Sequence, residues 1–200
     1  MIALPGYQIL AQIYESVNSV VYRAIREQDH SPVILKVLQG EFPPQSDIQK
    51  YEREYKILRN FNLDSVIKVY ELQTHQNTLV MTLEDFGGES LKILLATQKF
   101  TLLGFLTLAI KIAKGLREIH AANLIHKDIN PSNIIFNPAT GQVKLIDFSI
   151  SSGLTQESLR LHPPQNLEGN PPLYFSRTNR KNESVSRLSN GFLFLGSNVL

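Results

Sequence analysis

The fold is decided by the stretch Leu124-Ile-His-Lys-Asp-Ile-Asn-Pro-Ser-Asn-Ile134, which is followed by Lys144-Leu-Ile-Asp-Phe-Ser149. Two polar side chains in the first stretch, Asp128 and Asn133, lie five positions apart. A carboxylate, Asp147, follows the apolar run of the second stretch. An Asp or Asn in a loop is usually a turn or cap residue, but three at these spacings between apolar runs indicate a site.

The two apolar runs predict a β-hairpin. Ile134–Phe136 and Val143–Ile146 have the composition of strands, and the turn-forming sequence Asn137-Pro-Ala-Thr-Gly141 separates them. Pairing of these strands would bring Asn133 and Asp147 side by side.

The composition predicts one globular domain. The chain has 200 residues, of which 42% are hydrophobic, and a net charge of +2, which does not call for a nucleic-acid partner. It has no cysteine, so neither a disulfide framework nor a thiolate metal site is expected. The N-terminus lacks the features of a secretory signal, and the apolar run Leu102–Ile110 is too short to span a bilayer. We therefore expect a cytoplasmic protein without a membrane segment.

The N-terminal part predicts a small sheet with one helix. Alternating apolar residues indicate strands, and helical spacing after a Ser-Asp capping pair indicates the helix. The expected order is strands Tyr7–Ile13, Ser19–Arg26 and Val33–Leu38, helix Ser46–Phe61, and strands Val66–Leu72 and Thr78–Leu83. Phe86-Gly-Gly88 then breaks the chain.

A second helix is predicted over Thr101–His120, where apolar residues recur on one stripe. This stripe is expected to be buried, and it contains Leu102, Phe105, Leu106, Ala109, Ile112, Ala113, Leu116 and Ile119.

From Tyr7 to about Gly169, these motifs and elements resemble the eukaryotic-type serine/threonine protein kinases. The similarity is greatest to the bacterial kinases that head large multidomain sensor proteins. The resemblance implies an α+β fold, with a five-stranded small lobe carrying one main helix and the beginning of a mostly helical large lobe. The partial kinase domain would cover residues 1–169, with the small lobe at about 1–85 and the start of the large lobe at 86–169. It also implies ATP and Mg²⁺ as cofactors, a protein substrate, and sensor domains downstream in intact relatives.

The resemblance assigns roles to the three polar residues. Asp128 matches the catalytic aspartate, which accepts or orients the proton of the attacking hydroxyl. Asn133 and Asp147 match the magnesium ligands. His126 is expected to brace the loop.

Two further residues match an ion pair of the small lobe. Lys36, in Val-Ile-Leu-Lys, matches the lysine that contacts the α- and β-phosphates. Glu54 matches the helix glutamate that pairs with it, and Glu52 is the nearby alternative. Ile57 and Leu58 favour Glu54, because they keep it in register with the core face.

The nucleotide pocket is less well defined. Met81 falls near the position that guards the adenine, with Leu83 in the connecting segment, although a core methionine explains Met81 equally well. Tyr14, Ser16 and Ser19 occupy the three positions of the glycine-rich loop. Side chains there limit the approach of backbone N–H groups to phosphate, so weak ATP binding is expected.

Three more positions depart from the family pattern. Lys127 replaces an arginine and weakens any bidentate contact to a phosphorylated loop. Asn130 stands where a lysine near the transferred phosphate is usual, and Ser149 replaces the glycine after Asp-Phe.

The segment after residue 169 does not continue the pattern. Codons that can encode Tyr174–Ser184 read Ile-Ser-Pro-Glu in a shifted frame, and those of Val185–Leu200 can supply Asp-Phe-Tyr-Ser-Leu-Gly. Both are sequence motifs that the kinase family has at this point of the chain. We therefore interpret residues 170–200 as an out-of-frame, weakly ordered tail.

The sequence thus predicts a serine/threonine protein kinase domain that is incomplete and inactive in this chain. The alternative is a non-catalytic, pseudokinase-like module that binds nucleotide or a partner. A small-molecule phosphotransferase shares the Asp-to-Asn spacing, but the restored Ser-Pro-Glu motif argues against it.

Overall fold

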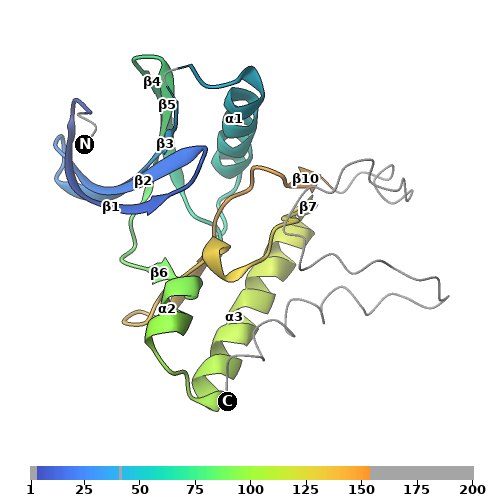
Figure 1. Cartoon of the computed structure of the whole chain (residues 1–200). Helices are drawn as coiled ribbons and strands as arrows, with labels where there is room; N and C mark the ends of the chain where they lie inside the picture. Colours follow the sequence, from blue (N-terminus) through green and yellow to red (C-terminus); the bar gives the residue numbers. More distant parts are fainter. Residues whose placement is uncertain (1–3, 41, 154–200) are drawn as a thin grey trace. The chain divides into compact units, whose positions relative to one another are not determined.

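The computed structural model describes residues 4–40 and 42–153, and these residues form two compact units (Figure 1). The first unit contains the described residues up to Asn62 together with Val66–Gly87. The second contains Leu63–Ser65 and the described residues from Gly88 onward. The tail expected at 170–200 lies outside the described residues.

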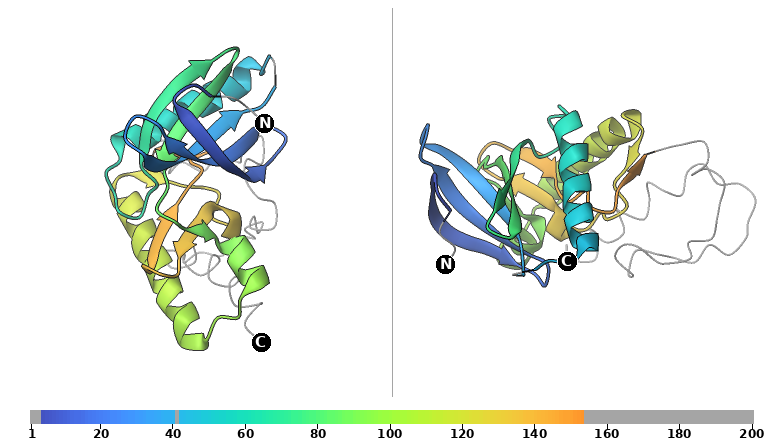
Figure 2. Two further views of the ribbon diagram at one scale, coloured as in Figure 1. Left: turned by 90° about the vertical axis from the view of Figure 1, so that its left-hand side faces the viewer. Right: turned by 90° about the horizontal axis from the view of Figure 1, so that it is seen from above.

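The first unit is a five-stranded antiparallel sheet with the strand order β1-β2-β3-β5-β4. A single long helix, α1, lies against this sheet and contacts β4 and β5 (Figures 1 and 2). The elements are β1 (Tyr7–Glu15), β2 (Ser19–Arg26), β3 (Ser31–Leu38), α1 (Gln45–Asn60), β4 (Val69–His75) and β5 (Thr78–Glu84).

The core of this unit follows from the alternation of side chains along its strands. On β3, Val33, Leu35 and Val37 point to one face and are buried. They pack in one cluster with Tyr7, whose hydroxyl donates to Glu71 Oε1 (2.6 Å). Lys36 lies on the opposite face of β3, and this alternation separates its ammonium from the apolar cluster.

The second unit joins a small sheet and two helices. Strands β6, β8 and β9 form one antiparallel sheet, and β7 pairs with β10. Helix α3 lies along the β8–β9 hairpin and contacts β9 (Figure 2). The elements are β6 (Glu89–Ser90), α2 (Leu91–Thr97), α3 (Leu102–Ala121), β7 (Leu124–Ile125), the 3₁₀ turn η1 (Pro131–Asn133), β8 (Ile134–Asn137), β9 (Gln142–Leu145) and β10 (Ser152–Gly153).

The buried face of α3 differs from the predicted stripe. Leu102 and Leu106 were expected to be buried, but they are exposed, as is Ile110. The residues that α3 buries are Leu108, Ala109, Ile112, Gly115 and Ile119. The helix is apolar on more than one side, so periodicity did not identify the side that meets the hairpin.

Within the described residues, no helix is long and apolar enough to cross a bilayer.

Candidate active site

The loop between β7 and β8 is shaped by its own polar side chains. Asn130 precedes η1, and its Oδ1 accepts a hydrogen bond from the backbone N–H of Ser132 (2.9 Å). Pro131 begins η1, where its missing N–H costs no hydrogen bond. Asn130, which replaces the lysine that is usual in the family, therefore caps the turn that carries Asn133.

Asp128 and Asn133, which the sequence assigned to one site, are in direct contact. Asn133 Nδ2 donates to Asp128 Oδ2 (2.9 Å) and to the Asp128 carbonyl oxygen (3.0 Å). Asp128 Oδ1 is buried and has no hydrogen-bond partner among the described residues. A buried carboxylate oxygen without a donor is costly, so this atom is a candidate for accepting a proton from a bound molecule.

The predicted hairpin is present and links Asn133 to the segment of Asp147. Ile134 pairs with Leu145, and the N–H of Ile146 donates to the Asn133 carbonyl (3.1 Å). Asp147 has a left-handed backbone, with φ of 64°. For a residue other than glycine this conformation is strained, and strain of this kind gathers at functional sites. Ser149 donates its N–H to Asp147 Oδ1 (3.3 Å).

The oxygen atoms of this region fit a hard divalent cation. Asn133 uses its amide nitrogen in both bonds to Asp128, which orients its amide oxygen as the remaining ligand atom. No group of three or more His, Cys, Asp or Glu side chains suited to a metal occurs in residues 4–40 and 42–153. Two protein oxygens with phosphate oxygens completing the shell are the arrangement that Mg²⁺ commonly takes.

His126 braces the loop, as predicted. Its ring is buried, its Nε2 donates to the Ile146 carbonyl (2.9 Å), and its Nδ1 accepts from the Asp128 N–H (3.3 Å). The ring lies 4.5 Å from that of Phe148, measured between centroids. These bonds assign the neutral tautomer, and burial lowers the pKa of His126 below its ordinary 6.5.

The lowered pKa of His126 predicts an acid-sensitive contribution to stability. The unfolded chain takes up a proton near the ordinary pKa, whereas the folded chain resists it. The stabilisation is therefore complete above about pH 6.5 and is lost as the pH falls toward the lowered pKa. Urea unfolding at about pH 7.5 and 5.5 should show a smaller pH dependence in His126→Gln than in the wild type. His120→Gln, which changes an exposed histidine of α3, should behave like the wild type; equal pH dependence in all three proteins would contradict the assignment.

In the first unit, the structure brings together Lys36 and Glu54. Lys36 Nζ donates to Glu54 Oε1 (2.9 Å) and Oε2 (2.7 Å), and the Glu54 side chain is only 3% exposed. A buried carboxylate needs such a partner. Glu54 rather than Glu52 is therefore the partner of the strand lysine.

The β1–β2 hairpin, which carries Tyr14, Ser16 and Ser19, is closed at its turn by serine contacts. Ser16 donates its N–H to the Ser19 carbonyl (2.9 Å), and Ser19 donates its N–H to Ser16 Oγ (3.1 Å). Tyr14 is exposed. Both serine N–H groups are already used within the turn, so neither is directed at a ligand.

Met81 lies directly across from Lys36 in the β3–β5 pairing, and Leu83 lies across from Ile34. Directly paired residues share a face of the sheet, so Met81 lies on the face that carries Lys36. Both Met81 and Leu83 are buried.

One residue that touches Lys36 was not identified from the sequence. Tyr51 lies on the same face of α1 as Glu54 and contacts Lys36. An aromatic residue three positions before a buried helix carboxylate is the signal that could have revealed it.

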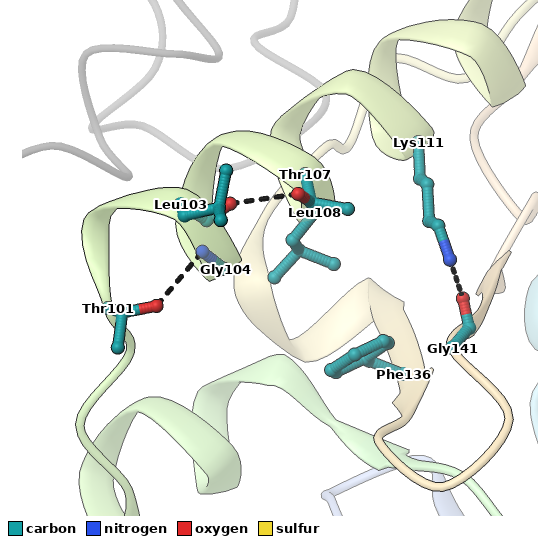
Figure 3. Close-up of a pocket in the computed structure, with 8 residues that line it drawn as sticks. All are labelled: Thr101, Leu103, Gly104, Thr107, Leu108, Lys111, Phe136 and Gly141. Atoms are coloured by element: carbon teal, nitrogen blue, oxygen red, sulfur yellow. Dashed lines mark hydrogen bonds between the residues drawn. The ribbon is translucent and has the colours of Figure 1, made fainter.

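A separate hollow of about 360 Å³ lies in the second unit, between α3 and the β8–β9 turn (Figure 3). In its wall, the N–H of Gly104 donates to Thr101 Oγ1 (3.1 Å), and Lys111 donates to the Gly141 carbonyl. It is lined by Thr101, Leu103, Gly104, Thr107, Leu108, Lys111, Phe136 and Gly141, none of which is a predicted site residue.

The paired Asp128 and Asn133, the strained Asp147 and the buried Lys36–Glu54 pair define the class of protein. The family model described as the protein kinase domain matches residues 7–171, and the chain belongs to this family.

The chain is similar to known serine/threonine kinases. It is 28% identical over 157 residues to the serine/threonine-protein kinase sid1 of Schizosaccharomyces pombe, a match that covers 78% of this chain and 33% of the relative. It is also 28% identical over 152 residues to the serine/threonine-protein kinase PknA of Mycobacterium tuberculosis, covering 72% of this chain and 33% of the relative. The chain thus spans about a third of the length of these relatives.

Proposed function

We propose that this chain carries part of an ATP- and magnesium-dependent serine/threonine protein kinase domain, which when intact transfers the γ-phosphoryl group to a protein hydroxyl and which is incomplete and inactive in this chain. The observation that carries the proposal is the buried Oδ1 of Asp128, which has no hydrogen-bond partner within residues 4–40 and 42–153, while the other oxygen is fixed by Asn133. A carboxylate held in this way can orient the attacking hydroxyl and accept its proton.

Asn133 and Asp147 would hold the magnesium ion. When bound, the ion neutralises charge on the phosphates. The hairpin bond between Ile146 and Asn133 supports this assignment, because it ties the segments of the two ligands together. Asp128 then remains free of the metal and serves the hydroxyl.

The first unit would supply the nucleotide contacts. Lys36, oriented by Glu54, is suited to the phosphate oxygens. Met81 and Leu83 would contact the adenine. The self-closed turn at Ser16 and Ser19 supports weak phosphate binding by this loop.

A kinase domain of catalytic type is favoured over a pseudokinase-like module. The residues of both proposed groups are present, and the contacts of Lys36 with Glu54 and of Asp128 with Asn133 support catalytic roles in the intact kinase domain. The substitution at Asn130 removes one cation but has its own explanation in the cap of η1.

The remaining assignments follow from this function. We propose that a kinase domain ends near residue 169 and that residues 170–200 are an out-of-frame tail. Its substrate would be a protein serine or threonine, and intact relatives would carry sensor domains downstream. A cytoplasmic location suits an ATP-dependent enzyme without cysteine.

Thermal unfolding with and without ATP and Mg²⁺ tests the proposal. Mg²⁺ and ATP together should raise the melting temperature of the wild type, because a ligand stabilises the state that binds it. Lys36→Ala should show a clearly smaller shift, whereas Asp128→Asn should keep it, since Asp128 serves the hydroxyl rather than the nucleotide. Any label that passes from [γ-³²P]ATP to serine or threonine of casein should disappear in Asp128→Asn. No shift in the wild type, or label transfer that survives in Asp128→Asn, would count against this function.

A further inference from the structure

Tyr51 contacts Lys36 at two points, and both contacts lie within the first unit. Its hydroxyl donates to the main-chain carbonyl oxygen of Lys36 (2.5 Å). Its ring lies beneath the ammonium, with Lys36 Nζ 5.5 Å from the ring centroid. The side chain is buried, so the contacts are shielded from water.

The hydroxyl contact ties α1 to β3 at the functional residue itself. Tyr51 and Glu54 are three positions apart, so they project from the same face of α1. Glu54 holds the end of the Lys36 side chain, and Tyr51 holds its backbone. A rotation or shift of α1 would therefore have to break both contacts.

The ring contact acts differently from the carboxylate. Glu54 receives two N–H bonds from the ammonium, and each bond uses a donor that a phosphate could otherwise take. The face of an aromatic ring attracts a cation through its quadrupole and does not consume a hydrogen-bond donor. Tyr51 can therefore stabilise the charged lysine without using one of its hydrogen-bond donors.

We propose that Tyr51 is a positioning residue that holds the Lys36 ammonium for phosphate binding. It acts through Lys36 and touches neither nucleotide nor metal. The inference rests on the proposed function insofar as Lys36 binds phosphate, whereas the placement of the ammonium by Tyr51 does not depend on it.

The test uses graded substitutions in the full chain. Tyr51→Phe removes the hydroxyl bond and keeps the ring, and Tyr51→Leu removes both. Tyr55→Phe is the matched control one turn further along α1, where the hydroxyl bonds to Arg59 and an arginine lies over the ring. ¹H–¹⁵N spectra of lysine Nζ without nucleotide should show a shifted or lost Lys36 signal in Tyr51→Leu and an unchanged one in Tyr55→Phe.

Affinity for ATP with Mg²⁺ gives the second readout. Tyr51→Phe should weaken binding by about two- to threefold and Tyr51→Leu by about tenfold, with no change in Tyr55→Phe. In a Lys36→Ala background, Tyr51→Leu should have no further effect, because its action passes through the lysine. Urea unfolding of each variant establishes that the variant is folded under the conditions in which its ATP affinity is measured.

The outcomes separate the inference from the proposed function. An unchanged Lys36 Nζ signal in Tyr51→Leu, or an equal loss of affinity with and without Lys36, would overturn the positioning role. If the wild type binds no ATP, the proposed function fails, and the nucleotide-free Nζ spectra still decide whether Tyr51 places the ammonium.

Discussion

Replacing Asp147 by alanine is expected to remove most of the ATP affinity that magnesium confers on this chain. The serine N–H groups of the β1–β2 turn are used within the turn, so the metal and Lys36 must provide most of the phosphate recognition. Loss of the carboxylate leaves Asn133 as the remaining proposed protein ligand. We expect ATP binding in Mg²⁺ to weaken at least tenfold, or by about 1.4 kcal/mol, and binding in EDTA to change far less.

Isothermal titration of the wild type and Asp147→Ala, each with Mg²⁺ and with EDTA, measures this difference. Asp64→Ala is the control, because it removes one exposed carboxylate of the same unit and equals the variant in net charge. Equal ATP affinity with and without Mg²⁺ in the wild type would reject the metal site. So would an Asp147→Ala protein that binds as the wild type does.

Much of the sheet of the first unit was predictable because buried and less buried residues alternate along β2 and β3. Alternation gave β2 with its observed bounds, Ser19–Arg26, and the other strands to within a few residues. The β8–β9 hairpin was predictable for a similar reason, since turn-forming residues separate two apolar runs. The spacing of Asp128 and Asn133 assigned them to one site, but their direct contact across η1 was not predicted.

Other features depend on tertiary contacts that the sequence pattern does not encode. Helix α2 is short, and its signal was little more than Ser90, which accepts the N–H of Ile93 at the helix start. The contact of Tyr51 with Lys36 requires knowing how α1 lies on β3. The closed serine turn uses hydroxyl bonds that residue type alone does not specify. The roles proposed for the site residues in catalysis remain predictions.

The packing of α3 predicts a large loss of stability when Gly115 is replaced by a larger residue. A Cβ atom at this position would lie 2.8 Å from the Cβ atom of Ser65, which is closer than non-bonded carbon atoms approach one another. Ser65 cannot move easily, because its Oγ donates to Glu118 Oε2 (2.6 Å) and its carbonyl accepts from the N–H of Leu145 (2.8 Å). The glycine therefore allows α3, β9 and the Leu63–Ser65 segment to meet.

Gly115→Val is expected to lower the free energy of unfolding by about 3 kcal/mol, at the upper end of overpacking effects, because three groups must separate to admit the side chain. Gly115→Ala should lose less, because alanine recovers up to about 1 kcal/mol of helix propensity. The control is Gly104→Ala on the same helix, where the nearest atom to the new Cβ is the rotatable hydroxyl of Thr101 at 3.2 Å. Its stability should stay near that of the wild type. Urea unfolding followed by circular dichroism measures all three variants, and a Gly115→Val protein as stable as Gly104→Ala would show that α3 does not pack on Ser65 as described.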